Sequence, residues 1–428
     1  MKPLPHHLQK YIVEQNYEKY TWLDHAVWRY VLRQLRHFLK IHAHECYAEG
    51  LEKTGIDIEK IPRIESISAK LKNFGWCALP VSGFIPPAAF MELQSLGVLP
   101  IASDMRSVDH LLYTPAPDIV HEAAGHAPIL IHPEYAEYLR QYAQIAKKAI
   151  ISKHDLEHYE AIRILSDLKE SPTTTPEEVK KAEYNLAAVT KNITHTSEAA
   201  ELSRMNWWTA EYGLIGPMDK PKIFGAGLLS SVGESQRCLS DEVKKIPLTV
   251  ECIKQSYDIT EPQPQLFVAK DFKNLNEVLQ QMAETMAFKI GGKLGLDKAI
   301  KAESINTAEL DSGLQISGQI VKYILSESAE VAYLQLAGPT QISFQDKQLD
   351  GHDIKYHQHG YGTPIGELQE IQWSKLREGQ NYHLNYKSGV AVTGTVEKIK
   401  LISGSVKIIT FKNATATYKN EVLFQPDW

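Results

Sequence analysis

The hydrophobic pattern of this chain changes its period near residue 290, and this change constrains the fold more than any other feature. Upstream, apolar residues recur every three or four positions, which gives a helix one apolar face. An example is the run Trp28, Val31, Leu32, Leu35 and Phe38. Downstream, β-branched and polar residues alternate, as they do in strands. We therefore predict a mainly α domain over residues 1–295, a linker over 296–311 and an all-β C-terminal domain over 312–428.

The β-patterned part contains an internal repeat. The stretch SGLQISG at residues 312–318 reappears as SGVAVTG at residues 388–394. Two copies of one β-unit would bury faces that neither could bury alone. The repeat predicts a small sandwich or barrel of two repeat units. Its function could be a homodimer interface, a regulatory ligand site or a partner-binding surface. Three further histidines, His352, His357 and His359, suggest a metal site, but the Gly and Asp residues around them favour an exposed loop.

Residues 141–204 are rich in charged, helix-forming side chains. A helix start is visible in this tract, because Thr175 can cap, Pro176 suits the first helical position and Glu178 completes a capping box. Charge patterning of this kind marks solvent-facing helices. We predict a charged helical insertion within the α domain.

Composition excludes several classes of protein. The net charge is −6 and no long basic run occurs, which argues against a nucleic-acid partner. The longest uncharged apolar stretch, residues 74–91, is interrupted by prolines and glycines and predicts no membrane helix. The N-terminus lacks the apolar core of a signal peptide, and the four cysteines form no CxxC pair. A reduced, cytoplasmic location is the expectation.

The sharpest local motif is the stretch PDIVHEAAGHAP at residues 117–128, which holds His121 and His126. It differs from the HExxH zinc-protease motif, whose histidines lie four apart and about 40° apart around a helix. A separation of five gives about 140° on a regular helix. Convergence on one metal ion therefore needs a π-type widening or a break in the helix, for which Gly125 and Pro128 provide the means.

A third ligand is needed, because two histidines leave most positions of a metal ion unfilled. A carboxylate would complete the 2-His-1-carboxylate arrangement that leaves positions open for dioxygen and substrate. Glu211 lies in the apolar and aromatic run NWWTAEYGL at residues 206–214. A buried carboxylate is costly unless it is paired or binds a metal. A structural Glu with an Arg or backbone partner is the alternative.

In ordered blocks from about residue 5 to 288, the chain resembles the pterin-dependent aromatic amino acid hydroxylases. The matching stretches are His25–Arg29, Ile61–Arg63, Tyr113–His126, Trp207–Leu214 and Gly225–Ser231. The resemblance implies the fold of that family and a monooxygenase that uses Fe(II), a tetrahydropterin and dioxygen. Its small-molecule substrate would be an aromatic amino acid. The metal ligands that it implies are His121, His126 and Glu211.

The resemblance also implies roles for residues around the metal. Asp118 and Ser230 would orient the first histidine, and Arg106 would pair with the amino-acid carboxylate. Thr114 would lie in the amino-acid pocket, where Pro117 and Trp207 would sandwich the substrate ring. The remaining implied positions are Phe90, Glu122, Gly83, Phe84 and Ile85 around the pterin. Taken singly, Arg106 fits a surface ion pair equally well, and Phe90 and Trp207 fit a core.

The chain departs from the family pattern at several positions. Ala123 and Ala124 replace larger apolar residues, Phe224 replaces a tyrosine, and Asn206 replaces an aromatic residue. The segment between His126 and Glu211 is longer than usual, and the predicted insertion accounts for the excess.

Two positions indicate which aromatic amino acid the enzyme would hydroxylate. Trp207 occupies the place where tryptophan-specific members carry a smaller aromatic residue, and Ile259 falls near an acidic residue of the tyrosine-specific members. Both favour conversion of L-phenylalanine to L-tyrosine. The alternatives are a tryptophan or meta-specific hydroxylase, a zinc-dependent hydrolase, and a catalytically inactive binding protein.

Overall fold

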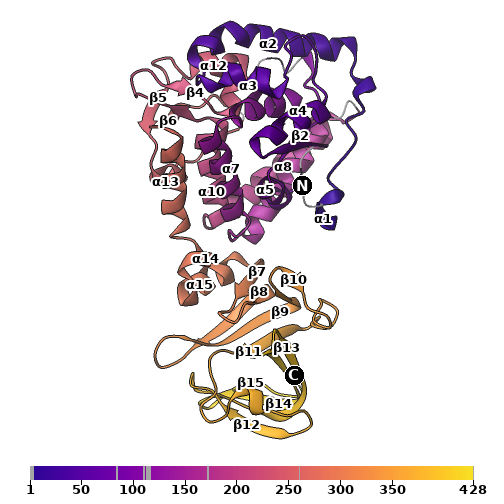
Figure 1. Cartoon of the computed structure of the whole chain (residues 1–428), viewed down its shortest axis with the longest axis vertical. Coiled ribbons are helices and arrows are strands. Elements are labelled where there is room, and N and C mark those ends of the chain that lie inside the picture. Colours follow the sequence, from indigo (N-terminus) through magenta and orange to yellow (C-terminus); the bar gives the residue numbers. More distant parts are fainter. Residues whose placement is uncertain are drawn as a thin grey trace. The chain divides into compact units, whose positions relative to one another are not determined.

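The computed structural model describes residues 4–82, 85–108, 111, 117–170, 173–259 and 261–427. The chain divides into two compact units. Unit 1 comprises residues 1–149 and 154–285, and unit 2 comprises residues 150–153 and 286–428. Figure 1 shows helices in most of unit 1 and strands in most of unit 2. None of the described helices is long and apolar enough to cross a membrane.

Unit 1 is built mainly from helices. Its helices of eight residues or more are α2 (Trp22–His42), α3 (Cys46–Thr54), α4 (Ile64–Leu71), α5 (Pro87–Ser95), α7 (Pro133–Ala146), α8 (Lys153–Glu170), α9 (Pro176–Lys191), α10 (Glu198–Asn206) and α13 (Phe272–Ala283). The short helices used below are α6 (Ala127–Ile129), α11 (Ala226–Leu229) and α12 (Val232–Arg237). Two further segments, η4 (Val120–His126) and η5 (Trp207–Glu211), are π-helical.

Unit 1 also holds two small sheets. Strands β1 (Cys77–Val81) and β2 (Val98–Ala102) pair in parallel. Four strands form a mixed sheet in the order β4-β3-β6-β5. Their bounds are β3 (Leu214–Ile215), β4 (Lys222–Ile223), β5 (Lys244–Pro247) and β6 (Gln265–Ala269). Strand β3 begins three residues after η5 ends, so this sheet anchors the segment that carries Glu211.

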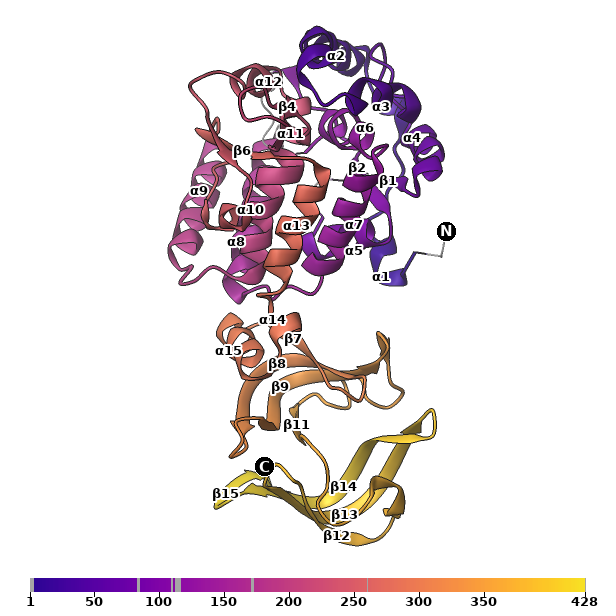
Figure 2. The same ribbon diagram turned by 60° about the vertical axis from the view of Figure 1, so that its left-hand side comes forward.

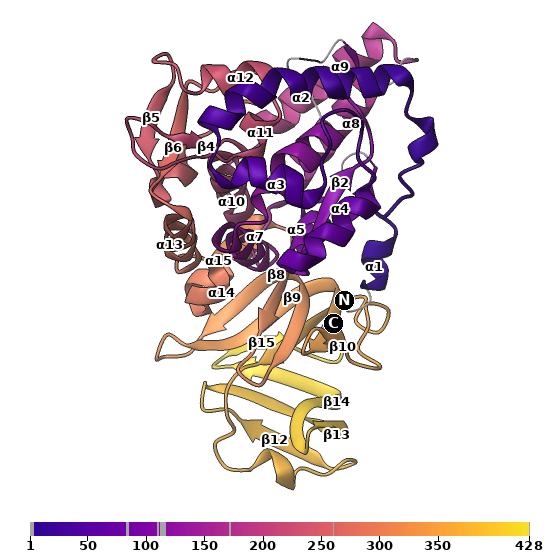
Figure 3. The ribbon, with the colours of Figure 1, turned by 45° about the horizontal axis from the view of Figure 1, so that its top comes forward.

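Helix α2 forms as its sequence pattern predicts. Thr21 and Asp24 make a reciprocal capping box at its start, which satisfies two backbone N–H groups. Four residues of the predicted face, from Trp28 to Leu35, are buried, whereas Phe38 is half-buried and stacks on His42 with ring centroids 4.2 Å apart. Figure 3 shows α2 beside α12.

Helix α7 ties the core of unit 1 to the segment that precedes Glu211. Its buried tyrosines form hydrogen bonds to α10 and η5, and Figure 2 shows α13 between α7 and α10 in that view. The Tyr138 hydroxyl lies 2.7 Å from Thr209 Oγ1, and the Tyr142 hydroxyl donates to the Leu202 carbonyl at 2.8 Å. These bonds hold α10 and η5 against α7.

The charged tract contains α8, α9 and α10. Thr175 and Glu178 form the predicted capping box at the start of α9, and Pro176 occupies its first turn. Of the residues of α9, Ala182 alone is buried. This helix is therefore solvent-facing, as its charge pattern predicts.

Unit 2 contains two antiparallel sheets and two helices. The first sheet has the order β10-β9-β8-β7 with β11 paired to β9, and the second has the order β12-β13-β14-β15. Figure 2 shows the two sheets as separate layers. The bounds are α14 (Ala287–Ile290), α15 (Gly292–Ala302), β7 (Ile305–Glu309), β8 (Leu314–Leu325), β9 (Val331–Phe344), β10 (Lys347–Gln348), β11 (Gly360–Pro364), β12 (Asn381–Asn385), β13 (Val390–Ile402), β14 (Ser405–Tyr418) and β15 (Glu421–Phe424). The all-β character predicted for the C-terminal region is thus present in its sheets.

Two expectations for this region need correction. Residues 296–311, expected as a linker, lie mostly in α15 and β7. The Lys- and Ala-rich composition that suggested a linker also suits a helix, and Ala299 and Ala302 pack into the core of unit 2. The loop of His352 is not simply exposed either, because that side chain is buried and its Nδ1 lies 3.1 Å from His357 Nε2.

Candidate metal centre

The first two candidate ligands stand on η4, which is π-helical from Val120 to His126. A π-helix aligns residues five apart, so the rings of His121 and His126 meet with centroids 4.9 Å apart. The sequence left open a π-type widening or a break in the helix, and the structure has the π-type widening. Gly125 allows the close packing of this segment, because a Cβ there would lie 2.7 Å from the Ala226 carbonyl oxygen on α11.

The third candidate ligand stands on the second π-helical segment, η5. Glu211 Oε2 lies 3.2 Å from His121 Nε2, and its Oε1 lies 3.3 Å from His126 Nε2. Bonds of about 2.0–2.2 Å to one ion would place neighbouring ligand atoms roughly 3 Å apart. Among the described residues, these three form the one group of three or more His, Cys, Asp or Glu side chains that could hold a metal ion.

The electrostatics of the group suit a cation. Burial raises the pKa of Glu211, but the two histidine rings, when protonated, outweigh this effect through their charge and hydrogen bonds and hold the pKa well below its usual value. The carboxylate is therefore ionised. Two neutral imidazoles and one carboxylate form the donor set that transition metals accept while keeping positions open. The residues present fit a mononuclear iron site by this test.

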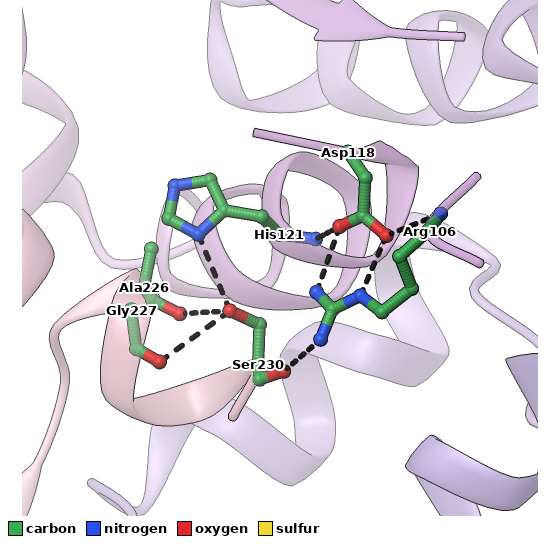
Figure 4. A network of polar contacts seen from close by, with 6 residues as sticks. All are labelled: Arg106, Asp118, His121, Ala226, Gly227 and Ser230. Carbon is green, nitrogen blue, oxygen red and sulfur yellow. Dashed lines mark hydrogen bonds and ion pairs between the residues drawn. The ribbon is translucent and has the colours of Figure 1, made fainter. Parts of the chain in front are cut away.

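Ser230 orients the first histidine (Figure 4). Its hydroxyl lies 2.7 Å from the Ala226 carbonyl, to which it donates, and 3.2 Å from His121 Nδ1. Because the hydroxyl proton goes to the carbonyl, the Ser230 oxygen accepts from an N–H at Nδ1 of His121. This leaves the lone pair of His121 Nε2 directed at the metal position, as a metal ligand requires.

The Asp118 side chain binds the backbone of the same histidine. Its Oδ1 accepts from the His121 N–H at 3.0 Å. The carboxylate also forms a bidentate ion pair with Arg106, at 2.7 Å to Nε and 2.8 Å to Nη2. Burial opposes ionisation of Asp118, but Arg106 and the backbone N–H groups prevail and lower its pKa. Figure 4 shows the ion pair and the histidine as one network.

Arg106 is buried, so the surface ion pair considered from sequence is wrong. Asp118 occupies two arms of its guanidinium, and Nη1 lies 3.3 Å from the Ser230 carbonyl. A second carboxylate that binds Arg106 must therefore approach the part of the guanidinium that Asp118 does not occupy.

Trp207 has both ring faces covered. It stacks on Tyr257 with centroids 4.3 Å apart and planes 10° apart, and on Tyr212 at 4.5 Å and 24°. A substrate ring can therefore meet its edge and not its face. Pro117 is exposed beside η4. Sequence reasoning missed Tyr257, because nothing local to residue 257 indicates a partner fifty positions away.

The residues expected around a pterin are placed in part. Phe90 lies half-buried on α5, and Ile85 packs against the apolar cluster that contains Leu8 and Leu93. Glu122 is buried on η4, and burial raises its pKa to about 8. Three expected site residues, Gly83, Phe84 and Thr114, lie outside the described residues.

Asn206 is a second residue whose contact was missed. It is the last residue of α10, and its Nδ2 donates to Glu211 Oε1 at 3.2 Å. The departure of this position from the family pattern was the available signal, but sequence alone did not show the contact.

Two histidines and one carboxylate meet on two π-helical segments of a helical unit. This donor set is typical of enzymes that bind a single metal ion and keep positions open for dioxygen and substrate. Residues 10–158 and 182–298 match the family described as biopterin-dependent aromatic amino acid hydroxylases. The match covers more than half of the chain, and the chain belongs to this family. The resemblance stated from sequence is confirmed.

The chain is similar to several phenylalanine hydroxylases. The chain is 28% identical over 264 residues to a phenylalanine-4-hydroxylase of Pseudomonas aeruginosa, covering 61% of this chain and 84% of that one. It is 29% identical over 276 residues to the phenylalanine-4-hydroxylase of Bos taurus, covering 63% and 51%. A solved structure of the Chromobacterium violaceum phenylalanine hydroxylase with bound Fe(III) is 25% identical, with a TM-score of 0.50 over 66% of this chain and 91% of that one.

The buried ion pair generates a stability prediction. Asp118→Ala would leave the Arg106 guanidinium buried without its counter-charge, and removal of one partner of such a pair costs about 3–5 kcal/mol. We expect the free energy of unfolding, measured by urea denaturation of the metal-free protein, to fall by that amount.

The matched control is Asp167→Ala, which removes the carboxylate of an exposed pair with Arg163. Exposed pairs contribute little, so the control should unfold like the parent. Equal unfolding midpoints for the two variants would contradict the importance of the buried pair.

Proposed function

We propose that this chain is an iron- and tetrahydropterin-dependent monooxygenase that converts L-phenylalanine to L-tyrosine. The observation that carries the proposal is the convergence of His121, His126 and Glu211 in a chain of the biopterin-dependent family. The names of the relatives favour phenylalanine. The absence of an acidic residue at Ile259 and the presence of Trp207 favour it over tyrosine and tryptophan.

The three converging residues would hold Fe(II). When bound, the iron and the reduced pterin together activate dioxygen for transfer to the aromatic ring. The bond between His121 Nδ1 and Ser230 Oγ keeps His121 in the tautomer that would bind through Nε2, and Asp118 holds the backbone N–H of the same residue. It keeps Glu211 ionised between the two rings.

The amino acid would lie over Arg106, Thr114, Pro117 and Trp207. Arg106 Nη1 offers the charge for the substrate carboxylate, and its pairing with Asp118 fixes the guanidinium in one orientation. The edge of Trp207 would contact the substrate ring, because its faces are taken by two tyrosines.

The pterin would stack on Phe90 and hydrogen-bond to Glu122, and Gly83, Phe84 and Ile85 are the further pterin-binding positions that the family implies. Glu122 Oε2 is buried and has no hydrogen-bond partner among the described residues. A buried polar atom without a partner is costly, so a ligand N–H there would be stabilised.

The alternatives are not favoured. Family membership and the names of the relatives support a phenylalanine hydroxylase. No specific observation supports a zinc hydrolase, a tryptophan-specific or meta-specific enzyme, or an inactive binding protein.

We also propose that residues 141–204 contain a charged insertion and that unit 2 is a duplicated β-unit. The family match omits residues 159–181. The turn glycines Gly313 and Gly389 both have positive φ, and each lies against an aromatic ring of the neighbouring strand. Both copies have a register shift at their second glycine.

A cytoplasmic location is proposed from the four cysteines, which are buried and are not joined in disulfides in the described part of the chain.

Turnover tests the activity. The purified chain, loaded with Fe(II) and given a tetrahydropterin and dioxygen, should form tyrosine from phenylalanine, as measured by product chromatography. The same assay with tryptophan should give far less product. Turnover of tryptophan alone, or a meta-hydroxylated product, would overturn the assignment.

Removal of one ligand tests the metal site. His126→Ala leaves two ligands, so we expect Fe(II) and Co(II) binding to weaken by at least a hundredfold in an equilibrium titration. His154→Ala, in an exposed pair with Glu157 on α8, is the matched control and should bind like the parent. Unchanged metal binding by His126→Ala would refute the site.

We propose that unit 2 makes the chain a homodimer. Strands β7 and β15 are at the edges of their sheets, and both expose apolar side chains, with Ile305 70% and Val422 39% exposed. Sedimentation of the full chain should give about twice 48.3 kDa. The combined change Ile305→Lys and Val422→Lys should give monomer, whereas Ile41→Lys, at an equally exposed position in unit 1, should not. A mass of 48.3 kDa for the parent at all concentrations would contradict a dimer.

A further inference from the structure

The two oxygens of the Glu211 carboxylate have different neighbours. Oε2 faces His121 Nε2, whereas Oε1 faces His126 Nε2 and also accepts from the Asn206 amide at 3.2 Å. Among the described residues, Asn206 Nδ2 is thus the one hydrogen-bond donor to this carboxylate that is not itself a candidate metal ligand.

The contact follows from the backbone of η5. Residues five apart are aligned on a π-helix, and Asn206 and Glu211 are five apart across this segment. His121 and His126 have the same spacing across η4. On a regular helix the amide and the carboxylate would be about 140° apart around the axis, so the contact depends on the π-helical turn.

We propose that Asn206 is a positioning residue that holds Glu211 as a one-oxygen ligand, with Oε2 as the metal-binding atom. The inference rests on the proposed metal site. An oxygen that accepts a hydrogen bond has less electron density to donate, so the amide favours binding through the other oxygen. The amide also restricts rotation of a long side chain, which would otherwise lose that freedom when the metal binds.

The consequence concerns the number of open positions at the metal. A 2-His-1-carboxylate site with a one-oxygen carboxylate leaves one more position open than a site in which both oxygens bind. By holding Oε1, Asn206 keeps that position available to dioxygen or substrate. Removal of the amide would weaken metal binding and permit the carboxylate to bind with both oxygens.

The test uses the full chain and Co(II) as the probe. Asn206→Leu removes the donor at nearly constant volume, and loss of such a supporting bond typically weakens metal binding about 10- to 100-fold. We expect that loss in an equilibrium titration, together with a changed visible absorption spectrum of the Co(II) form, which reports its coordination. Asn185→Leu, on an exposed position of α9, is the matched control and should leave both unchanged.

A second background isolates the mechanism. In Glu211→Ala, where no carboxylate remains to be held, the added Asn206→Leu change should cause no further loss of Co(II) affinity. If the Leu variant does not fold, Asn206→Ser removes the amide without adding bulk and should show the same loss.

The outcomes separate this inference from the metal site itself. Parental affinity and spectrum in the folded Asn206 variants, with metal binding lost in His126→Ala, would overturn the role of Asn206 and leave the site standing. Retention of metal by His126→Ala would overturn the site, and the inference with it.

Discussion

The buried carboxylate of Asp118 is the contact on which the site depends. It binds the guanidinium of Arg106 and the backbone N–H of His121, and Arg106 reaches the Ser230 carbonyl. Ser230 in turn orients the His121 ring. One ion pair therefore links the residue 106 loop, η4 and the end of α11. Because the ion pair is buried, both side chains must keep their positions, since a charge in this interior is costly when its partner is missing.

The two π-helical segments decide which side chains meet. On regular helices, residues five apart diverge, and neither the two histidines nor Asn206 and Glu211 would be adjacent. Tertiary contacts hold both segments: Gly125 packs on the Ala226 carbonyl, and Tyr138 bonds to Thr209. The widened turns are thus part of the packing of unit 1, and the three candidate metal ligands stand on them.

Much of the site could be anticipated from residue types and spacing. The five-residue separation of His121 and His126 predicted either a π-type turn or a break in the helix, and the structure has the π-type turn. The capping residues Thr175 and Glu178 predicted the start of α9. Glu211 was indicated by its apolar and aromatic surroundings, because a buried carboxylate is costly unless it is paired or binds a metal. The resemblance then favoured the metal ligand over a structural Glu. The linker expected over residues 296–311 failed because its composition suits a helix as well as a loop.

By itself, the sequence determined the change from helical to strand patterning, the solvent-facing charge of α9 and the identity of the three candidate ligands. These follow from the period of apolar residues and from the chemistry of imidazole and carboxylate. Only the tertiary structure decided that Arg106 is engaged by Asp118, that two tyrosines cover Trp207 and that Asn206 reaches Glu211. These contacts depend on atoms brought together by packing or by a local change in helix geometry, which neither composition nor periodicity records.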